Sequence, residues 1–203
     1  GGYALVGHTY SFGAGRIAAL LVKTDAAGNL QWNKTYGGAD TEYAKSIIQT
    51  NDGGYAITGY TNASGNDDFW LVKTDSAGTK QWSRAYGRLG SQQANAIVQT
   101  NDGGYVLAGS NEEKWWLVKT SSAGAMQWDR TYSEAYRGAD SLVQTSKGGY
   151  AMAGLVRPYA SDNRNFGLII TDAYGEQLLN QTFRGGPYGW GRSMVQTIDG
   201  GYA

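Results

Sequence analysis

The sequence predicts an all-β protein built from four copies of one four-stranded unit, arranged as a β-propeller. A Gly-Gly-Tyr triplet recurs at residues 1, 53, 103, 148 and 200, with spacings of 52, 50, 45 and 52 residues. A repeat of about 50 residues is the length of one propeller blade. Each repeat also contains short apolar runs separated by Gly- and Asp-rich turns, which are typical of strands, and no helical periodicity interrupts them.

The unit at about residues 44–93 is the clearest, and its four strands are expected at 46–50, 55–60, 69–74 and 81–86. The Asn-Asp-Gly-Gly sequence at 51–54 predicts a hairpin, because Gly tolerates the positive φ angles of a tight turn. The third strand is almost continuously apolar, which indicates burial on both faces. A second tight turn at 75–78, with Asp at its start and Gly at its end, leads into the fourth strand.

The remaining units are expected at about 1–43, 94–138 and 139–190, with a closing strand at 191–203. The chain starts at a second strand, so residues 193–197 are predicted to supply the missing first strand beside residues 3–7. This pairing would close the ring through backbone hydrogen bonds. Residues 200–203 repeat residues 1–4, however, and both segments cannot fill one strand. A frayed end, a piece cut from a longer array and a larger ring shared by two chains remain open alternatives.

Composition narrows the class of protein. The 203 residues, expected to form a single domain over 1–203, are 41% hydrophobic and 13% aromatic, which excludes a disordered chain. Seventeen basic and seventeen acidic residues argue against nucleic-acid partners. The absence of cysteine excludes disulfides and thiolate metal sites. No apolar segment is long enough to suggest membrane insertion. The start at Gly1 indicates a processed or excised piece.

Three segments, at residues 1–7, 21–32 and 36–40, resemble SBBP-type β-propeller repeats. They read Gly-Gly-Tyr-Ala-Leu-Val-Gly, Leu-Val-Lys-Thr-Asp-Ala-Ala-Gly-Asn-Leu-Gln-Trp and Tyr-Gly-Gly-Ala-Asp. The resemblance covers essentially the whole chain and implies a propeller in an extracellular or cell-surface protein of bacteria or archaea. It carries over no catalytic residue. The fourth unit departs from the pattern at Ile170 and Leu179, so its blade is expected to pack differently.

The sequence shows no catalytic motif, and we expect neither a catalytic residue nor a cofactor or metal. His8 is the only histidine, in a position that varies between repeats, and no triad motif accompanies it. The repeated Asp residues are explained by turn geometry, and none lies in a calcium-loop pattern. Asp67 and Asp68 form the better local candidate for calcium. The recurring lysines favour a packing or edge role: Lys23, Lys73 and Lys119.

The connections between second and third strands, and between successive units, are expected at one end of each unit, here called the loop end. The hairpin turns lie at the opposite end, here called the turn end. Turn-end sequences are nearly invariant whereas loop-end sequences vary, and rigid scaffolds usually carry function on variable loops. The second-to-third-strand connections contribute the aromatic residues Tyr10, Phe12, Trp115 and Tyr159.

Aromatic rings beside polar groups are typical of carbohydrate or peptide sites, because the rings stack on apolar surfaces and the polar groups orient the ligand. The plainer alternative is that the rings cover the ends of the sheets. The candidate ligand-binding residues are Asp40, Glu42, Tyr43, Gln92, Gln93, Tyr136, Arg137, Tyr188, Trp190 and Arg192.

The leading hypothesis is a non-enzymatic extracellular module that binds a glycan or a surface protein at the loop end. The alternative is a structural subunit of a surface layer, filament or larger propeller assembly, acting as a homo-oligomer. A hydrolase or lyase that pairs Asp40 or Glu42 with Tyr136 or Arg137 ranks third. Sequons at three positions permit N-glycosylation: Asn33, Asn62 and Asn180.

Overall fold

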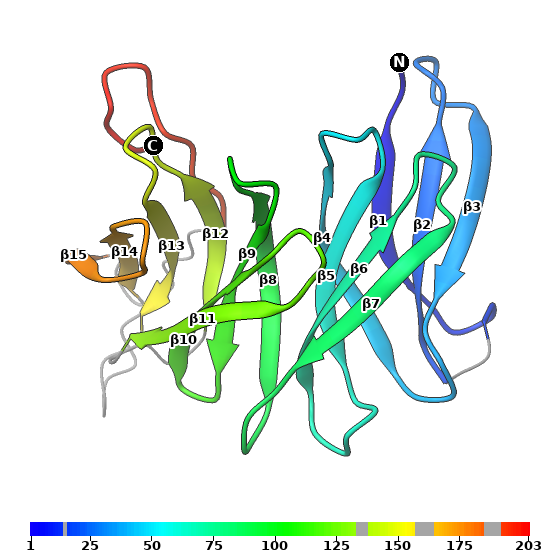
Figure 1. Ribbon diagram of the computed structural model, residues 1–203, viewed down its shortest axis with the longest axis horizontal. Coiled ribbons are helices and arrows are strands. Elements are labelled where there is room, and N and C mark those ends of the chain that lie inside the picture. Colours follow the sequence, from blue (N-terminus) through cyan, green and yellow to red (C-terminus); the bar gives the residue numbers. More distant parts are fainter. Residues whose placement is uncertain (14–15, 133–137, 157–164, 185–191) are drawn as a thin grey trace. The chain divides into compact units, whose positions relative to one another are not determined.

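The computed structural model describes residues 1–13, 16–132, 138–156, 165–184 and 192–203. The described residues form fifteen β-strands and no helix (Figure 1), which confirms the all-β prediction. None of them therefore forms a helix that could cross a membrane. The strands belong to two compact units, Gly1–Ala94 and Asn95–Ala203.

The first unit contains two antiparallel sheets in which neighbouring strands follow chain order. The first sheet has three strands, β1 (Ala4–Thr9), β2 (Ala18–Thr24) and β3 (Leu30–Tyr36). The second sheet has four, β4 (Glu42–Gln49), β5 (Tyr55–Thr61), β6 (Asp68–Thr74) and β7 (Lys80–Tyr86).

The second unit repeats this plan with two four-stranded antiparallel sheets. One consists of β8 (Gln92–Gln99), whose first three residues belong to the first unit, with β9 (Tyr105–Asn111), β10 (Lys114–Thr120) and β11 (Met126–Tyr132). The other consists of β12 (Ala139–Gln144), β13 (Tyr150–Val156), β14 (Asn165–Thr171) and β15 (Gln177–Arg184). The strand order predicted within each repeat, in which neighbouring strands follow chain order, is therefore confirmed.

The first strand of the second sheet is longer than predicted. A β-bulge shifts the register between Ala44 and Ser46, and pairing then continues back to Glu42. An extra residue in one strand lets the ladder resume beyond it. Glu42 and Tyr43, expected in a loop, are consequently held in β4 opposite Thr61 and Tyr60.

The repeated lysine and the Asp-Gly-Gly turn form one structural cluster at the turn end. Lys73 is 4% exposed, and its Nζ lies 2.8 Å from Asp52 Oδ2. The same Nζ donates to the Thr74 carbonyl at 2.7 Å and to Gln81 Oε1 at 3.3 Å. A Cβ at Gly54 would meet the Thr74 carbonyl and Lys73 Nζ, which explains why glycine precedes the tyrosine.

The same cluster returns in the third sheet and is lost as a whole in the fourth. Lys119 Nζ lies 2.8 Å from Asp102 Oδ2 and donates to Gln127 at 3.1 Å. In the fourth sheet the corresponding positions are Ile170 and Lys147, so the buried amine and its carboxylate are replaced together.

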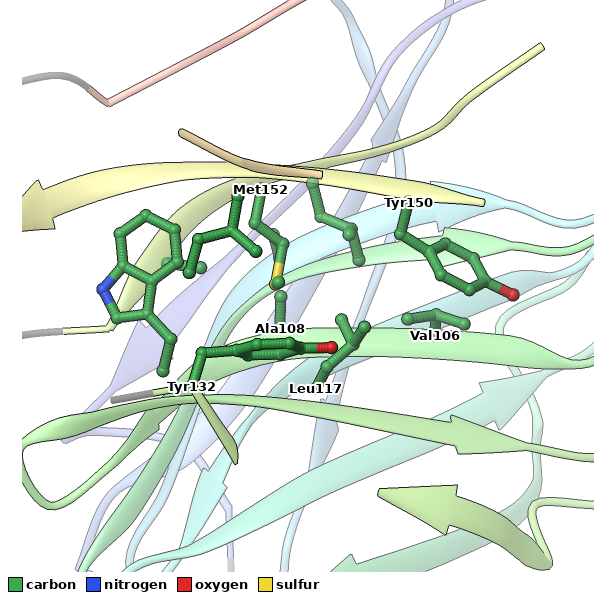
Figure 2. Packing of buried hydrophobic residues seen from close by; sticks show 11 residues of the cluster. Val106, Ala108, Leu117, Tyr132, Tyr150 and Met152 are labelled. Atoms are coloured by element: carbon green, nitrogen blue, oxygen red, sulfur yellow. The ribbon is translucent and has the colours of Figure 1, made fainter. Parts of the chain in front are cut away.

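Each of the two compact units, which contain two repeats each, buries an apolar core between its two sheets. In the first, Leu21 and Tyr36 pack with Ile57, Trp70 and Val72. In the second, Figure 2 shows Tyr150 and Met152 of β13 lying over four residues of the preceding sheet: Val106, Ala108, Leu117 and Tyr132.

A tyrosine at the end of the outer strand of the first sheet in each pair bonds to the second sheet's hairpin turn. The hydroxyl of Tyr36 donates to the Gly78 carbonyl at 2.7 Å, and that of Tyr132 donates to the Gly175 carbonyl at the same distance. Burial raises the pKa of Tyr36 to about 12, so this hydroxyl remains a donor at neutral pH.

Among the described strands, the outer strand of the last repeat, β15, has no following sheet within the second unit to cover it. All eight residues of β15 are exposed, and Leu179 is 41% exposed at the position where Trp32 and Trp128 pack against their cores.

Residues 192–203 form a short hairpin of their own. Val195 and Ala203 exchange backbone hydrogen bonds of 2.9 and 3.1 Å, and the Thr197 amide donates to the Gly201 carbonyl at 2.9 Å. The Met194 amide also donates to Ser141 Oγ at 3.0 Å. The duplicated Gly-Gly-Tyr-Ala at 200–203 thus takes the position beside 195–197 that residues 3–7 were predicted to fill.

Candidate ligand-binding site at the loop end

The first unit gathers aromatic rings from three strands and one loop at its loop end. The tyrosine cluster, as we call it, consists of His8, Tyr10, Tyr43 and Tyr60. Tyr43 and Tyr60 face each other across the β4–β5 pair and stack with ring centroids 4.8 Å apart. His8 of β1 meets Tyr43 edge-on at 4.5 Å, and Tyr10 meets His8 edge-on at 5.6 Å.

The rings are positioned by strand register rather than by a local motif. The bulge in β4 places Tyr43 directly opposite Tyr60, and directly opposed aromatic pairs stabilise a sheet. The hydroxyls of Tyr10 and Tyr43 lie 3.4 Å apart and link the loop after β1 to β4. Edge-to-face contacts of this kind contribute about 0.5–1.5 kcal/mol each beyond buried area.

Charged and amide side chains lie next to the aromatic rings. Lys45 Nζ lies 5.3 Å from the centroid of the Tyr60 ring and donates to Gln93 Oε1 at 3.0 Å. Gln93 Nε2 in turn donates to Asp67 Oδ2 at 2.8 Å, and Asn62 Nδ2 donates to Asp67 Oδ1 at 3.2 Å. This chain of hydrogen bonds orients one cation, one carboxylate and two amides around the stacked pair.

The phenols of the stacked pair remain protonated at neutral pH. The hydrogen bond with Tyr10 raises the pKa of Tyr43, with a smaller contribution from burial. Burial, together with the nearby Tyr43, raises the pKa of Tyr60 to about 12. The Tyr60 hydroxyl can therefore donate a hydrogen bond to a ligand, and the Tyr43 hydroxyl can accept one.

The structure brings together only some of the predicted site residues. Tyr43 and Gln93 belong to the tyrosine cluster and its polar surround. Asp40 is exposed on the loop before β4, and Arg192 is exposed in the second unit. Four further candidates lie outside the described residues: Tyr136, Arg137, Tyr188 and Trp190.

Gln92 does not face solvent, although it was predicted to contact a ligand. Its side chain is 0% exposed and closes the loop before β8. Gln92 Oε1 accepts the Arg88 amide proton at 2.9 Å, and Nε2 donates to the Leu89 carbonyl at 3.1 Å. The side chain therefore has a structural role in this loop.

Glu42 occupies the position of Gln92 one repeat earlier, and its side chain makes fewer hydrogen bonds. It is 4% exposed, and its Oε1 accepts a hydrogen bond from Thr61 Oγ1 at 3.3 Å. Within the described part of the chain, its Oε2 is buried without a hydrogen-bond partner. Burial raises the pKa of Glu42, and the nearby Gly38 amide and Thr61 hydroxyl, which favour the charged form, offset this only in part.

Two other sequence expectations are clarified by the structure. Trp115, predicted in a loop, is 0% exposed in β10 and belongs to the core. The suggested calcium ligands instead order their own loop, since Asp68 Oδ2 accepts a hydrogen bond from Ser64 Oγ at 2.8 Å. No cluster of three His, Asp or Glu side chains that could hold a metal occurs in the described ranges.

Sequence reasoning missed Lys45, Tyr60 and Asp67 as parts of the site. Tyr60 occupies the position that His8 holds in the first repeat, which was interpreted as an ordinary variable surface position. An aromatic residue at this position in two successive repeats was the signal that could have identified the cluster.

No protein-family model matches the chain, and no match is found among curated proteins. Among solved structures, the chain is similar to the β-1,2-mannobiose phosphorylase from Listeria innocua in its complex with β-1,2-mannobiose. The TM-score is 0.54 at 10% identity, and the match covers 90% of this chain. This chain spans 62% of the length of the phosphorylase, and the likeness is one of fold alone.

Proposed function

We propose that this chain is an extracellular, non-enzymatic β-propeller module, of the SBBP-type repeat class, that binds a glycan through its loop end. A surface protein that presents the same chemistry is the second ligand class. The single observation that carries the proposal is the tyrosine cluster, which combines stacked rings with oriented polar groups. In this proposal the four sheets are the blades of one domain, an arrangement supported by their shared strand order and even spacing.

The exposure of Tyr10, a member of the cluster, and of nearby Phe12 supports a ligand-binding role rather than a core role. Tyr10 is 69% exposed, and Phe12, two residues away, is 70% exposed. Stacking of a sugar face on such rings removes apolar surface from water, while the phenols, Gln93 and Lys45 supply donors and acceptors for hydroxyl groups. The rings of Tyr43 and Tyr60 are already held by packing, so binding loses little side-chain freedom there.

Glycan-array binding of the whole chain tests the proposal. We expect Tyr43→Ala to lower binding at least tenfold, because it removes the ring that contacts both His8 and Tyr60. Tyr174→Ala is the matched control, since Tyr174 is 71% exposed at a hairpin turn of the other unit. Equal binding by both variants, with unchanged folding, would contradict a site at the tyrosine cluster.

The alternative function, a subunit of a surface layer, filament or larger ring, is favoured by β15. It is the edge strand of its sheet and exposes Leu178 (68%) and Phe183 (50%). Edge strands with exposed apolar side chains can pair with other chains. Light scattering after size-exclusion chromatography distinguishes the two functions, since a monomer at all concentrations opposes assembly through β15.

An enzymatic role is not part of the proposal. The third hypothesis pairs Asp40 or Glu42 with Tyr136 or Arg137, and the latter two lie outside the described residues. Binding without turnover of the same glycan is the result we expect when products are followed by mass spectrometry.

A further inference from the structure

A groove of about 310 Å³ lies beside Glu42 in the first unit. The loop after β3, the end of β5 and the outer strand β7 all contribute to it, so it extends from the loop end along β7. Its polar and aromatic lining comes from Glu42, Thr61, Trp70, Lys80, Ser83 and Arg84. Pockets for whole drug-sized ligands begin at about 300 Å³, so this groove suits one monosaccharide unit rather than an extended chain.

Glu42 supplies the buried polar group of the groove. Gln92, at the same position in the next repeat, uses both ends of its amide within its own loop. Glu42 leaves Oε2 without a partner in the described part of the chain although the side chain is 4% exposed. A buried polar atom without a hydrogen bond is costly, and a hydroxyl group in the groove would satisfy it in either protonation state of the carboxyl.

Positive charge lies along the side of the groove formed by β7. Lys80 and Arg84 both line it and are exposed. Arg84 is held in place by a 2.9 Å hydrogen bond from Nη1 to the Ser83 carbonyl and by the Trp82 ring, 5.9 Å from its guanidinium carbon. Ammonium and guanidinium groups are the usual partners of a ligand carboxylate.

We propose that this groove binds a sugar unit that carries a carboxylate, of the uronic-acid class. A ring hydroxyl bonds Glu42 Oε2, the sugar carboxylate is neutralised by Lys80 and Arg84, and Trp70 and Thr61 line the remaining wall. The inference rests on the proposed glycan binding and specifies an acidic component for the ligand. It is nevertheless a separate subsite from the tyrosine cluster.

Ligand-observed NMR with methyl glycosides tests the subsite directly. The probes are the methyl glycosides of glucuronic and galacturonic acid, compared with those of glucose and galactose. We expect at least one uronide to bind at least tenfold more tightly than its neutral counterpart, with the difference reduced at high salt because charge carries it. Equal signals from acidic and neutral sugars, or none from either uronide, would overturn the proposal.

Variants separate the groove from the tyrosine cluster. Lys80→Ala and Arg84→Ala alter exposed side chains and should each weaken uronide binding about five- to tenfold, as expected for loss of about 1–1.4 kcal/mol. Lys34→Ala is the matched control, because Lys34 occupies the position of Arg84 one repeat earlier and does not line the groove. If both groove variants bind uronides like the unaltered protein, the subsite is wrong.

A third variant, Glu42→Ala, tests the role of the carboxyl group in uronide binding. Its amide NMR spectrum shows whether the variant is folded. Retained uronide affinity in the folded variant would limit Glu42 to a role in its own loop and overturn the assignment of its Oε2 to the ligand. Array binding that depends on Tyr43 but shows no preference for uronides would leave the proposed function standing and reject only this groove.

Discussion

Breaking the Lys73–Asp52 pair should cost more when the carboxylate is removed than when the amine is removed. The Lys73 side chain is 5% exposed whereas that of Asp52 is 56% exposed. Asp52→Ala therefore leaves a buried ammonium that retains only the Thr74 carbonyl and Gln81. Removal of one partner from a fully buried pair costs about 3–5 kcal/mol, and the exposure of Asp52 reduces our expectation to about 2 kcal/mol.

Lys73→Ile should cost less, about 1 kcal/mol, the ordinary net value of a lost hydrogen bond. Asp52 then remains solvated and still accepts from Thr50 Oγ1 at 2.5 Å and from the Gly54 amide at 3.0 Å. The double variant Asp52→Lys with Lys73→Ile reproduces the fourth repeat, which carries Lys147 and Ile170. Its stability should be close to that of the unaltered chain.

Urea unfolding followed by tryptophan fluorescence provides the free energies, and the double variant Asp52→Ala with Lys73→Ile completes the double-mutant cycle with the two single variants. The matched cycle at Asp102 and Lys119 should behave in the same way, because the geometry is repeated. Additive effects in both cycles, or a larger loss from Lys73→Ile than from Asp52→Ala, would refute the reasoning.

The coupling free energy between Asp52 and Lys73 should also decrease in acid. Hydrogen bonding from Lys73 lowers the pKa of Asp52 to about 2, so its contribution is present above the ordinary value of about 3.9 and is lost as pH falls towards 2.

Two further predictions concern buried polar groups in the first unit. Glu42→Gln should raise stability by about 1 kcal/mol at pH 7, because burial raises the pKa of Glu42 and the charged form therefore destabilises the folded state. The gain should disappear as pH falls below the unfolded value of about 4.3, and a gain that persists in thermal unfolding at pH 3 would contradict this cause. Tyr36→Phe should lower stability by about 1–2 kcal/mol, since the Gly78 carbonyl loses its buried donor; an unchanged urea midpoint would show that water replaces it.

Strand positions were predicted well where local chemistry sets them. The third strand expected at 69–74 is β6, Asp68–Thr74, and the second expected at 55–60 is β5, Tyr55–Thr61. Each borders a tight turn that contains Asp and Gly and whose hydrogen bonds join residues two to four positions apart, such as those of Asp75 with the amides of Ala77 and Thr79. Interactions over so few residues are visible in the sequence itself.

The candidate site was predicted only in part, because its contacts join distant segments. Tyr10 and Tyr43 are 33 residues apart in the chain, and Gln93 and Asp67 are 26 apart. The bulge that moves Tyr43 into β4 carries no clear sequence signal, since Ala44 and Ser46 are ordinary strand residues. Trp115 was misplaced for a related reason, because an aromatic residue beside a loop can point to the core or to solvent.

The sequence by itself determined the repeat, the order of strands in each sheet and the turn chemistry, since these depend on periodicity and on residues close together in the chain. Only the tertiary structure decided which side chains share an environment. It placed the neighbours Glu42 and Tyr43 in a surface groove and in an aromatic cluster, and it buried Gln92 while leaving Tyr10 exposed. Burial and contact between strands depend on register and on packing of whole sheets, which no single repeat specifies.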